Sequence, residues 1–242
     1  MNNANSPCDA EQQGSGAAAN WLGPRTRVSR YDAFISYSHS LDGRLAPALQ
    51  TALHRFAKPW YRLRALRVFR DDASLSANSA LWQSLENALQ QSEWLILLAS
   101  PTAAASNWVA KEVEFWGAHR TRERTIVVLT DGEIAWDSRS ADFDWSRTTS
   151  LPATASGLFA EEPRIVDLRW VRAETDVSLA NPRFVEAVAD IAASVDGRPK
   201  DELVGDDVRQ HARTRRIVAG TIAILSVLLL GTVLAAILAV QQ

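Results

Sequence analysis

Residues that form disulfides and metal sites are scarce in this chain of 242 residues. The single cysteine, Cys8, excludes an intramolecular disulfide and is typical of a protein in a reducing, cytoplasm-facing compartment. The four histidines are scattered and lack the close spacing of zinc ligands. We therefore expect neither a metal nor another cofactor. The histidines are His39, His54, His119 and His211.

Motifs that bind nucleotides are also missing, and so is a surplus of positive charge. Lysine and arginine number 26 against 28 aspartates and glutamates, a formal net charge of -2, whereas a sequence-independent nucleic-acid binder carries a basic excess. Gly14 and Gly16 form a Gly-x-Gly that no predicted strand precedes, as a dinucleotide-binding turn would require. A P-loop, an HExxH pair and a Gly-x-Ser-x-Gly elbow are absent. We expect no nucleic acid as partner and no kinase, metalloprotease or serine-hydrolase chemistry.

The two ends of the chain differ from the middle in composition. Residues 1–27 are rich in Asn, Gln, Ser, Gly and Ala without apolar periodicity, which predicts a disordered lead, and they do not have the pattern of a signal peptide. Ile217–Val240 holds 24 residues and no charge. As a helix it is about 36 Å long, enough to cross a bilayer, and it has no polar face. We predict a transmembrane helix over residues 217–240.

Charge on either side of this segment predicts its orientation. The preceding linker, residues 198–216, is polar and then basic, with four arginines in its last eight residues, whereas only Gln241 and Gln242 follow the apolar segment. Arginine is enriched on the cytoplasmic side of membrane helices. We expect a single-pass protein of the cell inner membrane whose soluble domain, residues 28–197, faces the cytoplasm.

The middle of the chain alternates short apolar runs with amphipathic segments. The apolar runs lack strict alternation, which is typical of strands buried on both faces. Five strand–helix repeats predict an α/β fold, a flavodoxin-like doubly wound five-stranded parallel sheet. Asn181 as N-cap, Pro182 in the first helical position and Gly197 just past the end mark the last helix. The predicted strands are Tyr31–Tyr37, Arg67–Arg70, Trp94–Ala99, Thr125–Thr130 and Arg164–Trp170; the predicted helices are Gly43–Ala57, Ala77–Gln91, Asn107–His119, a weak one near Leu151–Phe159, and Asn181–Val195.

Polar residues follow the predicted strands, at the edge where open α/β sheets bind ligands. Ser38 follows the first strand, and Asp71 follows the second. In the helix Asn107–His119, Trp108 and Glu112 are four residues apart and therefore share a face. An aromatic ring one turn before a carboxylate suits a flat, positively charged ring that is joined to a sugar.

Spacing alone allows two interpretations of this pair. In one, Trp108 and Glu112 bind a ligand; in the other, which spacing alone favours, Trp108 fills the core and Glu112 is a solvated charge. Glu114 lies on another face of the same helix and is expected to be exposed. Loop structure explains Ser38 and Asp71 nearly as well as a binding role does.

Taken together, these segments resemble a TIR (Toll/interleukin-1 receptor) domain over residues 28–197. Tyr31–Ser38 (YDAFISYS) is similar to the family's box 1, and Arg70–Asn78 is similar to its box 2 and BB loop. Ser106–Glu112 (SNWVAKE) is similar to the family's helix after the third strand. With residues 217–240, the whole chain resembles bacterial TIR proteins that carry a C-terminal membrane segment.

Two departures from the family pattern concern the loops around the site. The Pro-Gly that is usual in receptor BB loops is replaced by Ser-Leu-Ser-Ala-Asn, which bears on the geometry of assembly. Ala57–Ala65 (AKPWYRLRA) lengthens the connection into the second strand. This longer connection is expected to reshape one wall of the site.

The resemblance implies one of two functions. NAD+-cleaving TIR domains carry a glutamate that falls on Glu112 here, after a tryptophan that matches Trp108. They release nicotinamide and ADP-ribose or a cyclic product, which implies a self-associating NAD+ nucleosidase in bacterial antiviral or stress defence. Glu112 is then the expected catalytic residue, and Trp108, Ser38 and Asp71 are the expected contacts to NAD+, a substrate rather than a cofactor. The alternative is a non-catalytic scaffold that signals through contacts with other TIR domains.

Overall fold

The computed structural model describes residues 29–56, 65–71, 79–120 and 122–203. The predicted lead, residues 1–27, and the predicted transmembrane helix, residues 217–240, lie outside this part, as do residues 57–64 and 72–78 of the two unusual loops. Among the described residues, no helix is both long and apolar enough to cross a bilayer. The transmembrane helix therefore stays a prediction.

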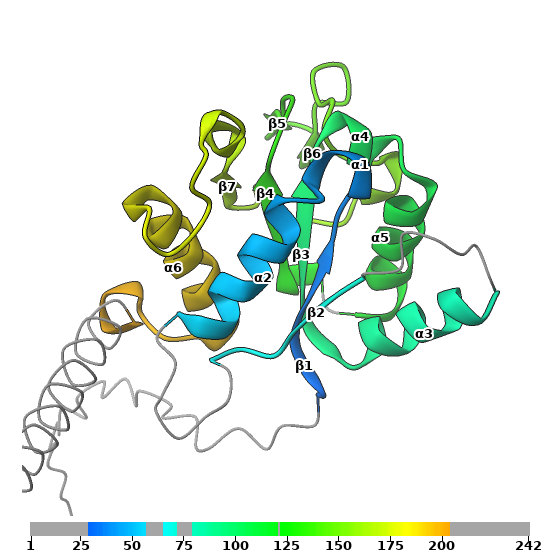
Figure 1. Cartoon of the computed structure of the whole chain (residues 1–242). Helices are drawn as coiled ribbons and strands as arrows, with labels where there is room; N and C mark the ends of the chain where they lie inside the picture. The colour runs from blue at the N-terminus through cyan, green and yellow to red at the C-terminus, as the bar shows by residue number, and fades with distance from the viewer. Residues whose placement is uncertain (1–28, 57–64, 72–78, 121, 204–242) are drawn as a thin grey trace, which may run out of the picture.

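Five parallel strands form the sheet at the centre of the molecule, in the order β2-β1-β3-β4-β7 (Figure 1). This is the strand order of flavodoxin-like folds, so the predicted doubly wound five-stranded parallel sheet is confirmed. All five strands end at the same edge, at the top of Figure 1. The strands are β1 (Tyr31–Ser36), β2 (Val68–Arg70), β3 (Ser92–Ala99), β4 (Thr125–Leu129) and β7 (Ile165–Asp167).

Helices cover both faces of the sheet, two on each side (Figure 1). Side chains alternate along β1, so that Ala33 and Ile35 pack under α2 and α6, whereas Phe34 packs under α3 and α5. All three side chains are fully buried. The helices are α2 (Leu45–Arg55), α6 (Pro182–Asp196), α3 (Ser79–Gln90) and α5 (Asn107–His119).

The helix ends follow the signals in the sequence. The side chain of Asn181 accepts hydrogen bonds from the backbone N–H groups of Arg183 and Phe184, and Gly197 ends α6 with φ of 70° in the left-handed region. The Ser106 hydroxyl accepts from the backbone N–H of Val109 at 3.4 Å and begins α5. The predicted bounds of α5 are confirmed at both ends.

The last described residues also pack on the domain. Leu203 is 4% exposed and belongs to the cluster under α2 and α6, together with Phe184 and Val195 of α6. This residue lies beyond 197, the predicted end of the domain. The packed domain therefore continues at least to Leu203.

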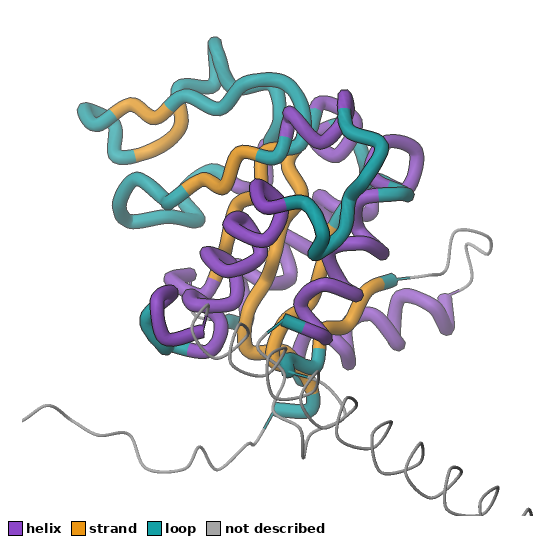
Figure 2. The backbone as a smooth tube through the Cα atoms, turned by 60° about the vertical axis from the view of Figure 1, so that its left-hand side comes forward, coloured by secondary structure: helices purple, strands orange, loops and turns teal. Residues whose placement is uncertain are grey.

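The segment between β4 and β7 differs from the prediction. The weak helix predicted near Leu151–Phe159 is wrong: the structure has only one 3₁₀ turn there, η2 (Ala153–Ala155). Pro152 precedes this turn and Gly157 follows it with φ of 66°, a conformation that ends a helix. A two-stranded hairpin, β5 (Trp136–Asp137) and β6 (Asp142–Phe143), was not predicted, because two-residue strands leave no periodic pattern (Figure 2).

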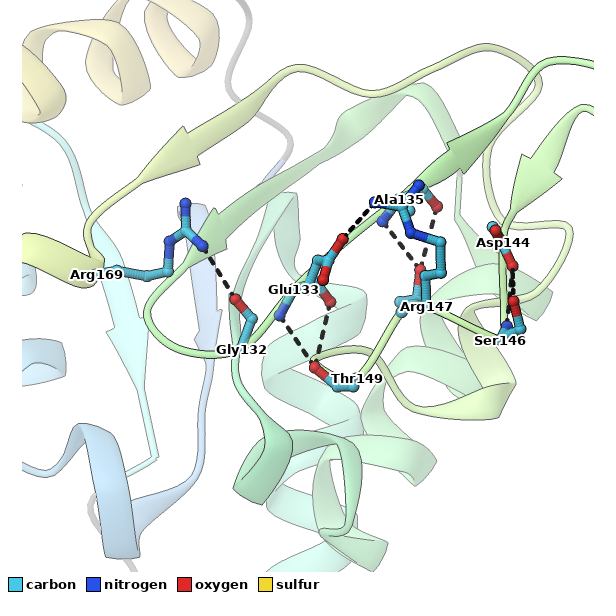
Figure 3. Close-up of polar contacts among 9 residues, drawn as sticks. Gly132, Glu133, Ala135, Asp144, Ser146, Arg147, Thr149 and Arg169 are labelled. Atoms are coloured by element: carbon cyan, nitrogen blue, oxygen red, sulfur yellow. Dashed lines mark hydrogen bonds and ion pairs between the residues drawn. The ribbon is translucent and has the colours of Figure 1, made fainter.

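Polar contacts hold the start of this segment in place (Figure 3). The Thr149 hydroxyl accepts from the backbone N–H of Glu133 at 3.0 Å, and Arg169 Nη1 donates to the carbonyl of Gly132 at 3.2 Å. Gly132 has φ of 76°, and a Cβ there would lie 2.4 Å from Ser150 Oγ and 2.9 Å from Pro101 Cγ. The close approach and the left-handed backbone both require glycine at this position.

Short helical turns complete the fold. Two of them, α1 and α4, lie shortly after β1 and β3 at the carboxyl edge of the sheet. A third begins after β7 because the Asp167 carboxylate accepts from the backbone N–H of Arg169 at 3.0 Å, which ends the strand sooner than predicted. The turns are α1 (His39–Asp42), α4 (Pro101–Ala104), η1 (Arg122–Arg124) and η3 (Arg169–Ala173).

Candidate functional site

Glu112 is a buried carboxyl group between α5 and the carboxyl end of β1. Its side chain is 4% exposed, and its Oε2 accepts a hydrogen bond of 2.5 Å from the Ser36 hydroxyl. Ser36 is the last residue of β1 and lies on the same face of the strand as Phe34, the face that α5 covers. The interpretation of Glu112 as a solvated helix charge is therefore wrong. Glu114, two residues further on, is exposed as expected.

The surroundings of Glu112 favour its protonated form. Burial and, to a smaller extent, the negative charge of Asp71 raise the pKa of Glu112 to about 8, while the hydrogen bond from Ser36 opposes both. Each effect acts on the same carboxyl group, and burial is the largest. At neutral pH most molecules in the absence of a ligand therefore hold a neutral Glu112.

Asp71 joins a polar network at the end of β2. Its backbone carbonyl accepts from the Tyr37 hydroxyl at 2.8 Å, and its Oδ2 lies 3.8 Å from Nε2 of His39. Arg70 Nη1 donates to the same Tyr37 oxygen at 2.8 Å. The negative charge of Asp71 acts on the pKa of Glu112, and the predicted contact of Asp71 to NAD+ stays a prediction.

Ser38 has a structural task in the turn after β1. Its hydroxyl lies 2.9 Å from that of Ser40, and its carbonyl accepts from the backbone N–H of Asp42 at 2.9 Å, at the start of α1. The side chain is buried, with 7% exposed. These contacts explain the buried position of the Ser38 side chain without a ligand. The predicted contact of Ser38 to NAD+ stays a prediction.

Trp108 lies one turn before Glu112 and reaches the surface. It is 39% exposed, so the interpretation as core filler is wrong. Its ring centroid is 6.0 Å from that of Trp82 on α3. The ammonium of Lys111 lies 5.5 Å from the Trp108 ring and 5.7 Å from the Trp82 ring. The two indoles therefore already hold a cation on an exposed aromatic surface.

Three members of this site were missed by reasoning from the sequence: Ser36, Trp82 and Lys111. One feature of the sequence indicates Ser36: it is a polar side chain in an apolar strand, on the face that α5 covers. No local pattern indicates Trp82, because its contact with Trp108 depends on how α3 and α5 pack. No cluster of three or more His, Cys, Asp or Glu within the described ranges is arranged to hold a metal ion.

Comparison with known proteins identifies relatives of the chain. The family model of the TIR domain matches residues 33–156. The chain is 49% identical over 201 residues to the NAD(+) hydrolase ApTIR of an Actinoplanes species; the match covers 83% of this chain and 28% of that protein. The chain thus spans less than a third of the length of that relative.

Two solved structures show a weaker likeness. The TIR domains of the activated Roq1 resistosome match 74% of this chain and 98% of their own, with 15% identity and a TM-score of 0.33. A diflavin flavoprotein A3 from Nostoc sp. matches 68% of this chain and 91% of its own, with 13% identity and a TM-score of 0.37. Because both TM-scores are below 0.5, neither likeness bears on the fold or the function.

Proposed function

Because this chain belongs to the TIR domain family, we propose that it is an NAD+ nucleosidase that releases nicotinamide and ADP-ribose or a cyclic product. The observation that carries the proposal is Glu112, a carboxyl group that is 4% exposed, set one helical turn after an exposed tryptophan. The similarity to a relative named as an NAD(+) hydrolase supports the same activity.

The reaction needs a negative charge beside the ribose. Nicotinamide leaves NAD+ as a neutral molecule when the C–N bond breaks and its electron pair moves to the ring nitrogen, so no general acid is required. The ribose left behind has the character of an oxocarbenium ion, to which water or a second nucleophile adds. A carboxylate near the ribose hydroxyls stabilises this charge. We assign that role to Glu112, with Ser36 holding Oε2 and the ribose approaching Oε1.

The substrate itself supplies the charge that ionises Glu112. Without substrate the pKa of Glu112 is raised to about 8 by burial. The nicotinamide ring of NAD+ is positively charged, and an opposite charge nearby lowers the pKa of a carboxyl group. Binding of NAD+ therefore favours loss of the Glu112 proton at the moment when the carboxylate is needed.

Trp108 is proposed to stack on the nicotinamide ring. The face of an indole attracts a cation, and Lys111 occupies this position in the structure without substrate. NAD+ would therefore displace the Lys111 ammonium from the indoles. Asp71 carries a negative charge near Glu112, which suits a ribose hydroxyl better than a phosphate. Ser38 remains a proposed contact to the ribose.

Anchoring and self-association are further parts of the proposal. A transmembrane helix over residues 217–240 would hold the TIR domain at the cytoplasmic face of the inner membrane, where tethering raises the local concentration of neighbouring copies. Self-association there would activate an immune or stress effector. The support is the uncharged run of 24 residues and the arginines that precede it.

Nicotinamide release from NAD+ by the full chain in liposomes tests the proposed activity. Glu112→Ala is expected to reduce turnover at least about 10²-fold, since loss of one electrostatic contact to a transition state has about this effect. Glu114→Ala, an exposed glutamate on the same helix, is the matched control and should retain activity. Normal turnover of Glu112→Ala would contradict the assignment, and inactive wild-type protein would favour the scaffold.

A further inference from the structure

Trp82 of α3 and Trp108 of α5 form two neighbouring indoles at the surface, which we call the indole pair. Their ring centroids are 6.0 Å apart, and their planes are inclined to each other by 42°. Trp108 is 39% exposed and Trp82 is half-buried, so neither ring is covered completely. The indole pair is therefore an aromatic surface that a cation or a flat ring can reach.

Lys111 places its own cation on this surface. Its ammonium is 5.5 Å from the centroid of the Trp108 ring and 5.7 Å from that of the Trp82 ring, close enough for a cation–π contact with each. Glu114 follows three residues later, a spacing at which opposite charges on a helix can pair. Among the described residues, however, Lys111 forms no ion pair. The two indoles, rather than a carboxylate, hold the ammonium.

Lys111 does not set the protonation of Glu112, although the two residues are adjacent in α5. The pKa of Glu112 depends on burial, on the hydrogen bond from Ser36 and on the charge of Asp71. The contacts of the Lys111 ammonium are those with the indole pair. Removal of the Lys111 side chain therefore uncovers the indoles and leaves these causes in place.

We propose that Lys111 is a built-in competitor for the nicotinamide ring of NAD+ and that Trp82 is a second wall of the site that binds this ring. The identity of the ring rests on the proposed NAD+ cleavage. A ring can lie on the indole pair only in molecules whose Lys111 has moved away, so the affinity for any ring is reduced by the fraction of uncovered molecules. This competition weakens neutral and cationic rings by the same factor, whereas simple repulsion between charges weakens cationic rings alone.

Two probes of nearly equal size measure this competition without cleavage: 1-methylnicotinamide, a cation, and nicotinamide, which is neutral. Their dissociation constants are measured by calorimetry with the full chain and with its Lys111→Ala variant, since an exposed helix position accepts alanine. Lys111→Ala is expected to tighten the binding of both probes by the same factor, at least about threefold, which is the order of an exposed cation–π contact. No gain for either probe, or a gain for the cation alone, would overturn the proposal.

Three further variants assign the effect to the indole pair. Lys111→Arg keeps a cation that indoles attract, so it should bind both probes within about twofold of the wild-type protein. Trp82→Leu stays apolar but removes one indole; it should weaken the binding of both probes, and Lys111→Ala should give a smaller gain in this background. Lys200→Ala is the matched control, because Lys200 pairs with Glu186 and Asp190 instead, and it should have no effect. If Trp82→Leu, with its fold verified, leaves the gain from Lys111→Ala unchanged, the proposal is wrong.

A turnover assay separates the failure of this proposal from the failure of the proposed function. With NAD+ as substrate, Lys111→Ala should lower KM by the factor that it lowers the dissociation constants of the probes. Absent turnover together with the expected probe binding would contradict NAD+ cleavage and leave the competition by Lys111 supported. Turnover together with probe binding that Lys111→Ala does not change would contradict the role of Lys111 alone.

Discussion

Glu112 and Asp42 are buried carboxyl groups near the same edge of the sheet, on opposite faces. They are almost equally buried, at 4% and 2% exposure. The pKa of Glu112 is raised to about 8, whereas that of Asp42 is raised to about 6. Their exposed fractions are alike, but more of the protein surrounds Glu112, so burial, the largest cause of both shifts, raises its pKa further.

The neighbours of each group add to the difference in pKa. Glu112 has one hydroxyl partner, Ser36, and the negative charge of Asp71 nearby. Asp42 has two hydroxyl groups and the positive charge of Arg172, which favour its ionised form, and the negative charge of Asp131, which opposes it. At neutral pH one site thus presents mainly a neutral carboxyl group and the other mainly a carboxylate. A positively charged ring beside the first group would favour its carboxylate form.

The largest expected effect is on stability at alkaline pH. A carboxyl group with a raised pKa in the folded state stabilises the protein below its unfolded pKa, and this contribution is lost as pH rises through the folded pKa. For Glu112 the loss extends from pH 4.5 to about 8 and amounts to about 5 kcal/mol. Glu112→Gln, which cannot ionise, should therefore raise the free energy of unfolding by up to about 5 kcal/mol at pH 9 and by little at pH 4.5, as measured by urea denaturation.

Glu114→Gln is the control for this measurement, because the exposed glutamate is not desolvated. It should change the free energy of unfolding by less than about 0.5 kcal/mol at every pH. A gain from Glu112→Gln that does not vary between pH 5 and 9 would contradict the proposed protonation of Glu112.

Asp42→Asn should raise the free energy of unfolding by less than Glu112→Gln does, and the gain should reach its full size at a lower pH. Its folded pKa of about 6 against an ordinary 3.8 corresponds to about 3 kcal/mol, lost between these two values as pH rises. The gain in the free energy of unfolding, relative to the wild-type protein, should grow with pH up to about pH 6 and stay constant above it. If Asp42→Asn and Glu112→Gln reach their full gain in stability at the same pH, the two carboxyl groups do not differ in pKa and the comparison is wrong.

Ser36→Ala is expected to change the pKa of Glu112 and not that of Asp42. The hydroxyl donates to the Glu112 carboxylate, so its loss should raise the pKa of that group further, by about one unit. The pH dependence of stability in this variant should extend to higher pH, as measured by the same denaturation series. Asp71→Asn removes a negative charge and should shift it the other way, and a shift of the same sign in both variants would refute the assigned causes.

The order of elements was predictable from the sequence because its signals are local. Apolar runs marked all five strands, and Asn181 and Gly197 marked the two ends of α6. The hairpin β5–β6 was not predictable, since strands of two residues leave no periodicity. Near Leu151–Phe159 the pattern predicts a weak helix that the structure lacks, because Pro152 and the left-handed backbone of Gly157 restrict the chain to one 3₁₀ turn.

The site was predictable only in part. Glu112 and Trp108 share a helix face, so their spacing and the family resemblance single them out. The contact of Glu112 with Ser36 joins residues 76 apart in the chain and depends on how α5 packs on β1. The unusual pKa of Glu112 results from that packing. Local patterns contain no information on it, and the protonation state of Glu112 follows from the structure alone.

The pH dependence of NAD+ cleavage at low substrate concentration tests the central claim most directly. Under these conditions the rate reports kcat/KM, and its pH dependence reports the pKa of the free protein. If Glu112 must lose its proton to act, the rate of nicotinamide release by the full chain should rise tenfold per pH unit below about pH 8 and level off above it. A rate that is constant from pH 6 to 9 would contradict the claim that a protonated, buried Glu112 is the group that acts on NAD+.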